Sequence, residues 1–467
     1  MAMGITSRLG AFAAGLTYGG IPPDVRERCR MSVLDGIGIM LGAADFAACD
    51  GDRRLKTYLE AMAPPGNVSA LGYGIRTTSL MAAFANGTLM EALDCQDTNL
   101  GIFAHSGTAV IPTALALAEA NHVTWADLVA AIVAGYEIHA RLLWAVQPSH
   151  NNKGFLATGT FGTCAAAVTA GRALGLDAEQ MTNALGIAGF VMPISNQDNQ
   201  FKGHNAKPVH GGHAAMSGLS AAHLAQVGYE AAPLEGEAPR YQAALTMLGD
   251  GHPNLERAIA GLNETWHTRD TAYKPYPIGH LIVGVIELIL DILAQRRIKP
   301  DEVAAVDVVT YKEALILTGK KYTTTESNYV DAHLSIAYCV AATLTDGEMT
   351  VRQLRKERLR DPKLHELASR VTVSEDPVMN KAFPNDWPAK VVLRLRGGDS
   401  IARQIDKVKW SPQRTPTWAE LAEKFHLMTD PIIGPERAAQ AIEIVAGLKE
   451  ASTLAPLMAT LQQKSGR

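Results

Sequence analysis

Residues 86–112 (NGTLMEALDCQDTNLGIFAHSGTAVIP) combine carboxylates, a hydroxyl and a histidine whose types and spacing could do acid/base chemistry. Their apolar spacing predicts a helix on which Asp94, Asp97 and Thr98 lie side by side on adjoining turns. A loop then brings His105 to the start of a second apolar helix. Imidazole titrates near neutral pH and a carboxylate such as that of Asp94 can orient it, so the pattern fits an acid/base site. A helix end with solvated acids and one loop histidine fits the same residues, because motifs this loose often arise by chance.

Two further stretches concentrate polar chemistry. Residues 202–213 (KGHNAKPVHGGH) hold two lysines and three histidines beside a glycine pair, in a spacing that matches no HExxH or cysteine-bearing zinc pattern. They fit an anion site made by lysine and the N–H groups of a helix start, or a polar loop. Residues 273–280 (YKPYPIGH) fix Lys274 and His280 among two prolines. They predict a stiff hinge that aims side chains, or a plain interdomain linker.

The elements that must position these side chains are mostly helices. The first 265 or so residues are rich in small and apolar residues at helical spacing. We predict helices at 24–41, 108–120, 124–146, 160–174, 178–189 and 214–228, the last two preceded by loops that carry Asp177 and the pair Gly211-Gly212.

The pattern changes after about Trp266. Residues 304–310 alternate as a strand, and 389–396 with 400–408 flank Gly397-Gly398-Asp399 as a hairpin, with helices expected at 332–344 and 350–358. A helical pattern returns at 417–461. We therefore predict a mainly α fold, with a large all-helical domain discontinuous in sequence (1–268 and 410–467) and a smaller α+β lid domain (269–409).

Composition restricts the function. The 467 residues are 47% hydrophobic and 19% charged with a net charge of −4, which is typical of a soluble globular protein and argues against a nucleic-acid partner. The five cysteines are scattered without metal-ligand spacing, which favours a reducing cytoplasm. We expect no signal peptide, and the apolar run 281–293 is too short to span a membrane and contains Glu287 and Asp291.

Five segments together resemble the MmgE/PrpD family, and they follow one another in the family order. They are LDCQDT with AHSG (93–107), KGFLATGTFG (153–162), AKPVHGGHAA (206–215), YKPYPIGH (273–280) and AHLSIAYCVAATLTDG (332–347). The resemblance implies a helical domain built from both ends of the chain, an α+β lid, a homodimer and an active site between the domains. It also implies activity on small di- or tricarboxylates without a metal or organic cofactor.

The resemblance places Asp94, Thr98, His105, Lys207 and Lys274 in the site, with His210 and His213 nearby. We predict catalytic roles for Asp94, His105, Lys207 and His280, and substrate-binding roles for Thr98, Lys202, His210, Lys274 and Tyr276. His105 is expected to act as the base, oriented by Asp94, while lysines hold the charge that develops on the substrate carboxylate.

Two departures from the family pattern guide the choice of reaction. Leu156 in GFLATG stands where many members carry histidine, and YKPYPIGH ends in His280 where dehydratase-like members read KPYPSCR. His280 would then replace the missing acid/base group. Epimerisation needs only a second acid, so we place an iminodisuccinate-type epimerase ahead of a 2-methylcitrate-type dehydratase and a cis-aconitate-type decarboxylase. The alternative from another class is an inactive homologue that only binds carboxylates.

Overall fold

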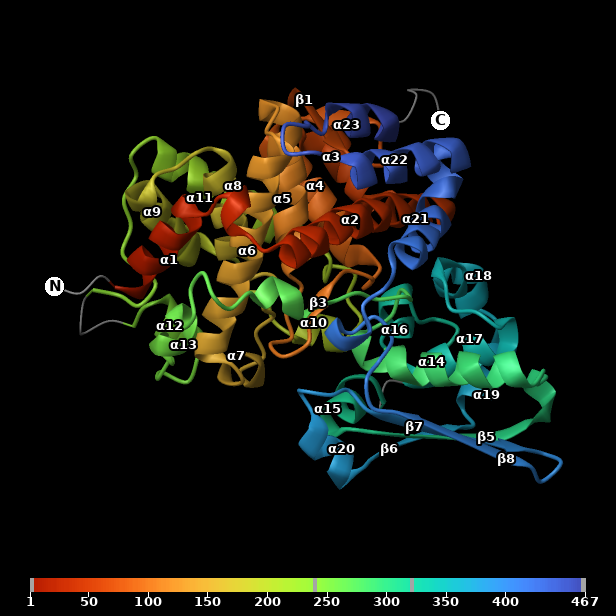
Figure 1. The fold of residues 1–467 in the computed structure, drawn as a ribbon. Coiled ribbons are helices and arrows are strands. Elements are labelled where there is room, and N and C mark those ends of the chain that lie inside the picture. The colour runs from red at the N-terminus through yellow and green to blue at the C-terminus, as the bar shows by residue number, and fades with distance from the viewer. Residues whose placement is uncertain (1–3, 238–241, 320–322, 463–467) are drawn as a thin grey trace.

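Helices dominate the computed structural model, which describes residues 4–237, 242–319 and 323–462 (Figure 1). A small mixed sheet lies in the C-terminal third of the chain. The prediction of a mainly α fold with an α+β part is confirmed.

The first part of the chain forms a body of packed helices with one small β ladder at its edge. The helices are α1 (Ile5–Gly15), α2 (Pro23–Cys49), α3 (Arg54–Met62), α4 (Ser79–Ala92), α5 (Ser106–Asn121), α6 (Trp125–Val146), α7 (Ser149–Asn152), α8 (Phe161–Ala173), α9 (Ala178–Val191), α10 (Asp198–Phe201), α11 (Val209–Gln226), α12 (Ala244–Leu248) and α13 (Leu255–Ile259). Strands β1 (Pro65–Ala70) and β2 (Ile75–Thr77) pair antiparallel.

Small residues let these helices approach closely. In α8 the alanines and glycines pack on α6 and α11 without an exposed face, which is how the Ala- and Gly-rich stretch buries itself. A Cβ on Gly212 of α11 would lie 2.3 Å from the carbonyl oxygen of Phe84 in α4, so only glycine allows α11 this close to α4. The glycine pair lies inside α11, which begins at Val209, so the predicted loop before residue 214 is wrong.

The α+β part follows from residue 280. Its elements are α14 (His280–Gln295), β5 (Val303–Thr310), α15 (Lys312–Ala314), α16 (Tyr329–Ala332), α17 (Ile336–Asp346), α18 (Lys356–Leu359), α19 (Pro362–Ala368), β6 (Val371–Glu375), α20 (Pro377–Ala382), β7 (Ala389–Leu395) and β8 (Ser400–Ile405). The sheet order is β6-β5-β7-β8, with β5 and β6 parallel and the other pairs antiparallel. The strand at 304–310 and the hairpin around Gly397-Gly398-Asp399 are confirmed, with Arg394 opposite Ser400.

Two predicted helices differ from the structure, and the helical pattern at the C-terminal end is divided among several helices. The segment 350–358 forms a 3₁₀ turn (Val351–Leu354) and the short α18. Residues 332–344 are split between the end of α16 and helix α17, which begins at Ile336, where the Ser335 side chain caps it by accepting from the Tyr338 N–H. The segment 417–461 is three helices, α21 (Trp418–Ile433), α22 (Pro435–Gly447) and α23 (Ala455–Leu461), and Gly434 with a φ of 83° breaks the first from the second.

The three C-terminal helices return to the helical body (Figure 1). Helix α21 packs along α2, where a Cβ on Gly42 would meet the Met428 sulfur at 2.7 Å. The chain therefore passes from the helical body to the α+β part and back, while the two domains and their boundaries at 268 and 410 stay predictions.

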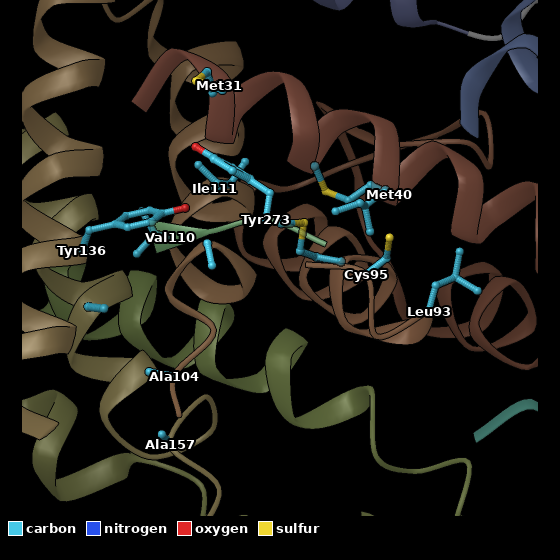
Figure 2. Close-up of a cluster of buried hydrophobic side chains, with 14 of the residues drawn as sticks. Met31, Met40, Leu93, Cys95, Ala104, Val110, Ile111, Tyr136, Ala157 and Tyr273 are labelled. Atoms are coloured by element: carbon cyan, nitrogen blue, oxygen red, sulfur yellow. The ribbon is translucent and has the colours of Figure 1, made fainter. Parts of the chain in front are cut away.

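A two-residue β ladder connects the segment after α4 with the segment before α14. Strand β3 (Thr98–Asn99) pairs with β4 (Thr271–Ala272), and Thr98 lies opposite Ala272. This pairing brings the segment after α4 beside the YKPYPIGH segment. Tyr273 and Cys95 anchor the two segments in one cluster of buried side chains under α2, together with Tyr136 of α6 (Figure 2). The ladder fixes which side chains of the two segments meet.

Among the residues that the structure describes, two helices are by length and composition alone apolar enough to cross a membrane, namely Pro23–Cys49 and Trp125–Val146. Both are mostly buried inside the structure, as core helices commonly are, so they are weak evidence for a membrane segment.

Candidate active site

Asp94 occupies a tight turn directly after α4. The helix ends at Ala92, and Asp94 has a φ of 50°, a left-handed conformation that is uncommon for a residue other than glycine. Lys274 holds the turn, because its Nζ contacts the Asp94 carboxylate and lies 2.7 Å from the Asp94 carbonyl oxygen. Lys207 Nζ lies 3.4 Å from the other carboxylate oxygen. The prediction that Asp94, Asp97 and Thr98 share a helix face is therefore wrong, since distant lysines set the backbone here.

Glu91, which the sequence analysis did not select, completes the charged cluster. Its carboxylate lies 2.6 Å from Lys207 Nζ and 3.3 Å from His210 Nε2. Burial by itself would raise its pKa, but Lys207 and His210 hold the pKa well below the ordinary value. Gln96 and Thr108 donate to its other oxygen at 2.9 and 3.1 Å. The sequence did contain a feature that could have identified Glu91, because it is an acidic residue in an otherwise apolar helix, one turn before Asp94.

Two buried carboxylates thus face two buried lysines. Asp94 also has its pKa held well below the ordinary value, because Lys207 and Lys274 outweigh the effect of burial. The pKa of Lys207 is raised, since Asp94 and Glu91 outweigh its own burial. The pKa shifts of Glu91, Asp94 and Lys207 all favour the charged form, and each carboxylate lies in an ion pair with a lysine. His333, a second residue that the sequence analysis missed, places Nε2 3.7 Å from Asp94.

His105 and His280 meet at the hydroxyl of Thr98. The Nδ1 atom of each ring lies 3.2 Å from Thr98 Oγ1. His105 immediately precedes α5, and His280 opens α14 of the α+β part. Burial, with a contribution from the charge on Lys274, lowers the pKa of His105 to about 4 and that of His280 well below its ordinary value. Both rings are therefore neutral at pH 7 in the empty site.

The hydrogen bonds assign different tautomers to the two rings. His105 Nδ1 lies 2.8 Å from the Asp97 carbonyl oxygen, which can only accept, so Nδ1 carries the proton and Nε2 has a free lone pair. The Thr98 hydroxyl then accepts from His105 and donates its one proton to Nδ1 of His280. This leaves the proton of His280 on Nε2, a buried atom without a hydrogen-bond partner. One ring presents a base and the other a donor.

Asp97 has a supporting position instead of the predicted place beside Asp94. Its carboxylate accepts from the hydroxyl of Tyr136 and from the backbone N–H of Gly107, the latter at 3.0 Å. Burial raises its pKa to about 6. The expectation that the Asp94 carboxylate orients His105 is also wrong, because the Asp97 carbonyl group and Thr98 do so.

A cavity of about 810 Å³ opens onto this cluster from between the helical body and the α+β part. Its lining includes six of the predicted site residues, namely Asp94, Thr98, His105, His210, Lys274 and His280, and also Glu91 and Leu156. The apolar Leu156 side chain thus lies at the cavity wall, where the family resemblance led us to expect histidine.

The other three predicted site residues, Lys202, Lys207 and Tyr276, do not line the cavity, and neither does His213. Lys207 is buried behind it, in contact with Glu91 and Asp94. Lys202 is exposed at the end of α10, and Tyr276 packs against the hydrophobic core. The His213 ring packs edge-on against Phe84, 5.2 Å away. Within residues 4–237, 242–319 and 323–462 no group of three or more His, Cys, Asp or Glu side chains is arranged to hold a metal ion.

Comparison with known proteins identifies similar chains over nearly the whole length. The MmgE/PrpD N-terminal domain matches residues 7–253, and the MmgE/PrpD C-terminal domain matches residues 276–450. A cis-aconitate decarboxylase from Aspergillus terreus is 26% identical over 480 residues, covering 98% of this chain and 96% of the relative. The cis-aconitate decarboxylase of Homo sapiens is 25% identical over 485 residues, covering 100% and 96%.

Proposed function

Because the chain belongs to the MmgE/PrpD family, we propose that it is an enzyme that moves a proton at a carbon next to a carboxylate of a small di- or tricarboxylate. Epimerisation is the reaction we favour. The observation that carries the proposal is the Thr98 hydroxyl between the two Nδ1 atoms of His105 and His280, which leaves one ring with an accepting nitrogen and the other with a donating nitrogen at the same cavity.

The proposed reaction begins at His105. Its Nε2 takes the proton from the carbon beside the carboxylate, and negative charge spreads onto the carboxylate oxygens. Lys274, which is buried and lines the cavity, stabilises that charge. Lys207, which contacts Glu91 and Asp94 behind the cavity wall, adds positive charge to the same region.

His280 would return the proton. In the empty site its Nε2–H is a hydrogen-bond donor for a carboxylate oxygen. A bound polycarboxylate brings negative charge close to the ring, which raises its pKa, so that a proton taken up with the substrate makes His280 an acid. Delivery of this proton to the other face of the planar carbon inverts the configuration. Leu156, which lines the same cavity, has no group to compete for this role.

Decarboxylation is the second candidate, because the relatives from Aspergillus terreus and Homo sapiens are cis-aconitate decarboxylases. It requires loss of a carboxylate from a poorly solvated position and one proton donor to the resulting carbanion. The buried cluster and His280 would supply these conditions. At about 25% identity the relatives support the reaction class more strongly than the individual reaction.

Proton NMR in D2O distinguishes these reactions with a panel of chiral and unsaturated di- and tricarboxylates. Epimerisation gives deuterium at the carbon beside the carboxylate together with loss of optical activity, whereas decarboxylation gives a shorter product and bicarbonate. His105→Ala is expected to slow the reaction by roughly 10²-fold or more. Binding without exchange or turnover across the panel would support the inactive carboxylate-binding homologue and overturn the proposal.

We also propose a homodimer. Large apolar side chains are exposed along residues 190–201, with Phe190 88% and Ile194 75% exposed and with Val191 and Phe201 beside them in the sequence. A second copy of the chain would cover them, and Phe201 also lines the cavity. Sedimentation velocity should give a dimer, which Phe190→Asp with Ile194→Asp should dissociate. A monomeric wild-type protein would contradict this.

A further inference from the structure

The inner end of the cavity offers an incoming polyanion no net positive charge. The two lysines there already neutralise Glu91 and Asp94. The two histidines that share Thr98 have lowered pKa values and are neutral when the site is empty. A substrate with two or more carboxylates therefore needs another source of positive charge, because the buried ion pairs cannot balance all its charges.

Two cations at the outer end of the same cavity provide it. Arg257 of α13 and Lys312 of α15 line the cavity, and both are exposed, in contrast to the buried inner cluster. The Arg257 guanidinium lies 4.6 Å from the ring centre of Trp144, another lining residue, which gives it a preferred place. The Lys312 backbone N–H donates to Asn380 Oδ1 at 2.7 Å, which fixes the start of α15.

Neither cation takes part in an ion pair among the described residues. In the part of the chain that the structure describes, no carboxylate lies within ion-pair distance of Arg257 or Lys312. Glu313 is the acid that lines the outer end with them, so one positive charge remains in excess there. Phe103, Trp144 and Trp387 line the space as aromatic walls. The cavity thus has a neutral buried end with acid/base groups and a positive outer end.

We propose that Arg257 and Lys312 form a second anion subsite, which binds an acidic group of the substrate remote from the reacting carbon. The assignment of the His105 end of the cavity as the end where the substrate reacts rests on the proposed function. The substrate class that fits is an elongated polycarboxylate, with one carboxylate beside His105 and another at the outer end. Because Arg257 belongs to the helical body and Lys312 to the α+β part, such a substrate joins the two parts and favours the arrangement in which both cations reach it.

Calorimetric titration with succinate, glutarate, adipate and suberate tests the subsite. The wild-type protein should bind the longer diacids more tightly than succinate. Arg257→Gln and Lys312→Gln should each weaken the best long diacid by roughly 5- to 10-fold, leave succinate within about 2-fold, and lose their effect as salt is raised. Arg297→Gln and Lys363→Gln, at exposed cations outside the cavity lining, serve as matched controls and should bind like wild type.

Two results would overturn the subsite, namely wild-type affinity for the long diacids in both variants, or equal weakening of succinate and suberate. Deuterium exchange of the bound diacids in D2O keeps this outcome separate from the proposed chemistry. A long diacid that loses affinity in Arg257→Gln without any exchange in the wild type supports the subsite and counts against the proposed reaction. If the variants exchange deuterium at the wild-type rate and do not selectively lose affinity for the long diacids, the result supports the proposed reaction and counts against the subsite.

Discussion

The hydroxyl of Thr98 is the smallest group on which the proposed chemistry depends. Its one proton and its lone pairs set the tautomers of His105 and His280. Thr98→Val keeps the shape of the side chain but removes this link, so we expect proton exchange to slow by roughly 10²-fold. Thr98→Ser should retain most of the activity because it keeps the hydroxyl. NMR of the imidazole nitrogens should show mixed tautomers in the valine variant; unchanged tautomers and rate would remove Thr98 from the mechanism.

The lowered pKa of His105 also determines the pH dependence. A histidine with an ordinary pKa loses its free lone pair as the pH falls through about 6.5. His105 has a pKa of about 4, so its base form persists in the free enzyme to lower pH. The rate at low substrate concentration, which reports the free enzyme, should therefore fall only as the pH approaches about 4. A decline centred near pH 6.5 would show that another group is the base.

At the scale of secondary-structure elements, helix α21 provides a second contact to the Asp94 turn, besides that of Lys274. Lys424 of α21 lies 2.6 Å from Asp35 of α2 and 3.2 Å from the carbonyl oxygen of Cys95, the residue after Asp94. All of these groups are buried. Lys424→Met leaves Asp35 without its partner, so we expect a loss of roughly 3–5 kcal/mol in the free energy of unfolding, measured with urea.

A double variant distinguishes the contribution of Lys424 to the stability of the fold from its contribution to the position of the Asp94 turn. Lys424→Met with Asp35→Leu removes both charges, so the free energy of unfolding should recover to near wild type. The Cys95 carbonyl group still lacks its donor, and the Asp94 turn loses one of its two supports. We therefore expect kcat to stay low while the fold is stable. Recovery of both properties would show that the pair stabilises the helices only.

The same turn explains what the sequence analysis predicted and what it missed. Helix α6, strand β5 and the hairpin β7–β8 follow from local spacing and glycines, and they were predicted closely, whereas α2 begins where predicted but continues to Cys49 instead of residue 41. The conformation of Asp94 depends on Lys274, far away in sequence, so local periodicity extended the helix through it. Glu91 resembled a helix-surface acid, because its lysine and histidine partners come from the segment before and within α11.

At the scale of the whole molecule, buried histidines connect stability to pH. His105, His139 and His150 each have a pKa lowered to about 4, mainly by burial. Well above pH ~6.5 these rings are neutral in both the folded and unfolded states, so they contribute no pH dependence. Between about pH 6.5 and pH 4 the unfolded chain binds protons that the folded chain does not. The free energy of unfolding should therefore decrease as the pH falls through this range.

Asp97 changes the free energy of unfolding in the opposite direction. Its pKa is raised to about 6, so as the pH falls the folded protein binds a proton at Asp97 before the unfolded chain does. By themselves, these three histidines and Asp97 give a net uptake of roughly two protons on unfolding near pH 5, which corresponds to about 3 kcal/mol lost per pH unit. His280, whose pKa is also lowered, acts in the same direction as the three histidines. Calorimetric unfolding in buffers of different ionisation enthalpy measures that number directly. We expect clear uptake at pH 5 and almost none at pH 7.5. Proton release at pH 5 would mean that these histidines are charged in the folded protein, which would also remove His105 as the neutral base.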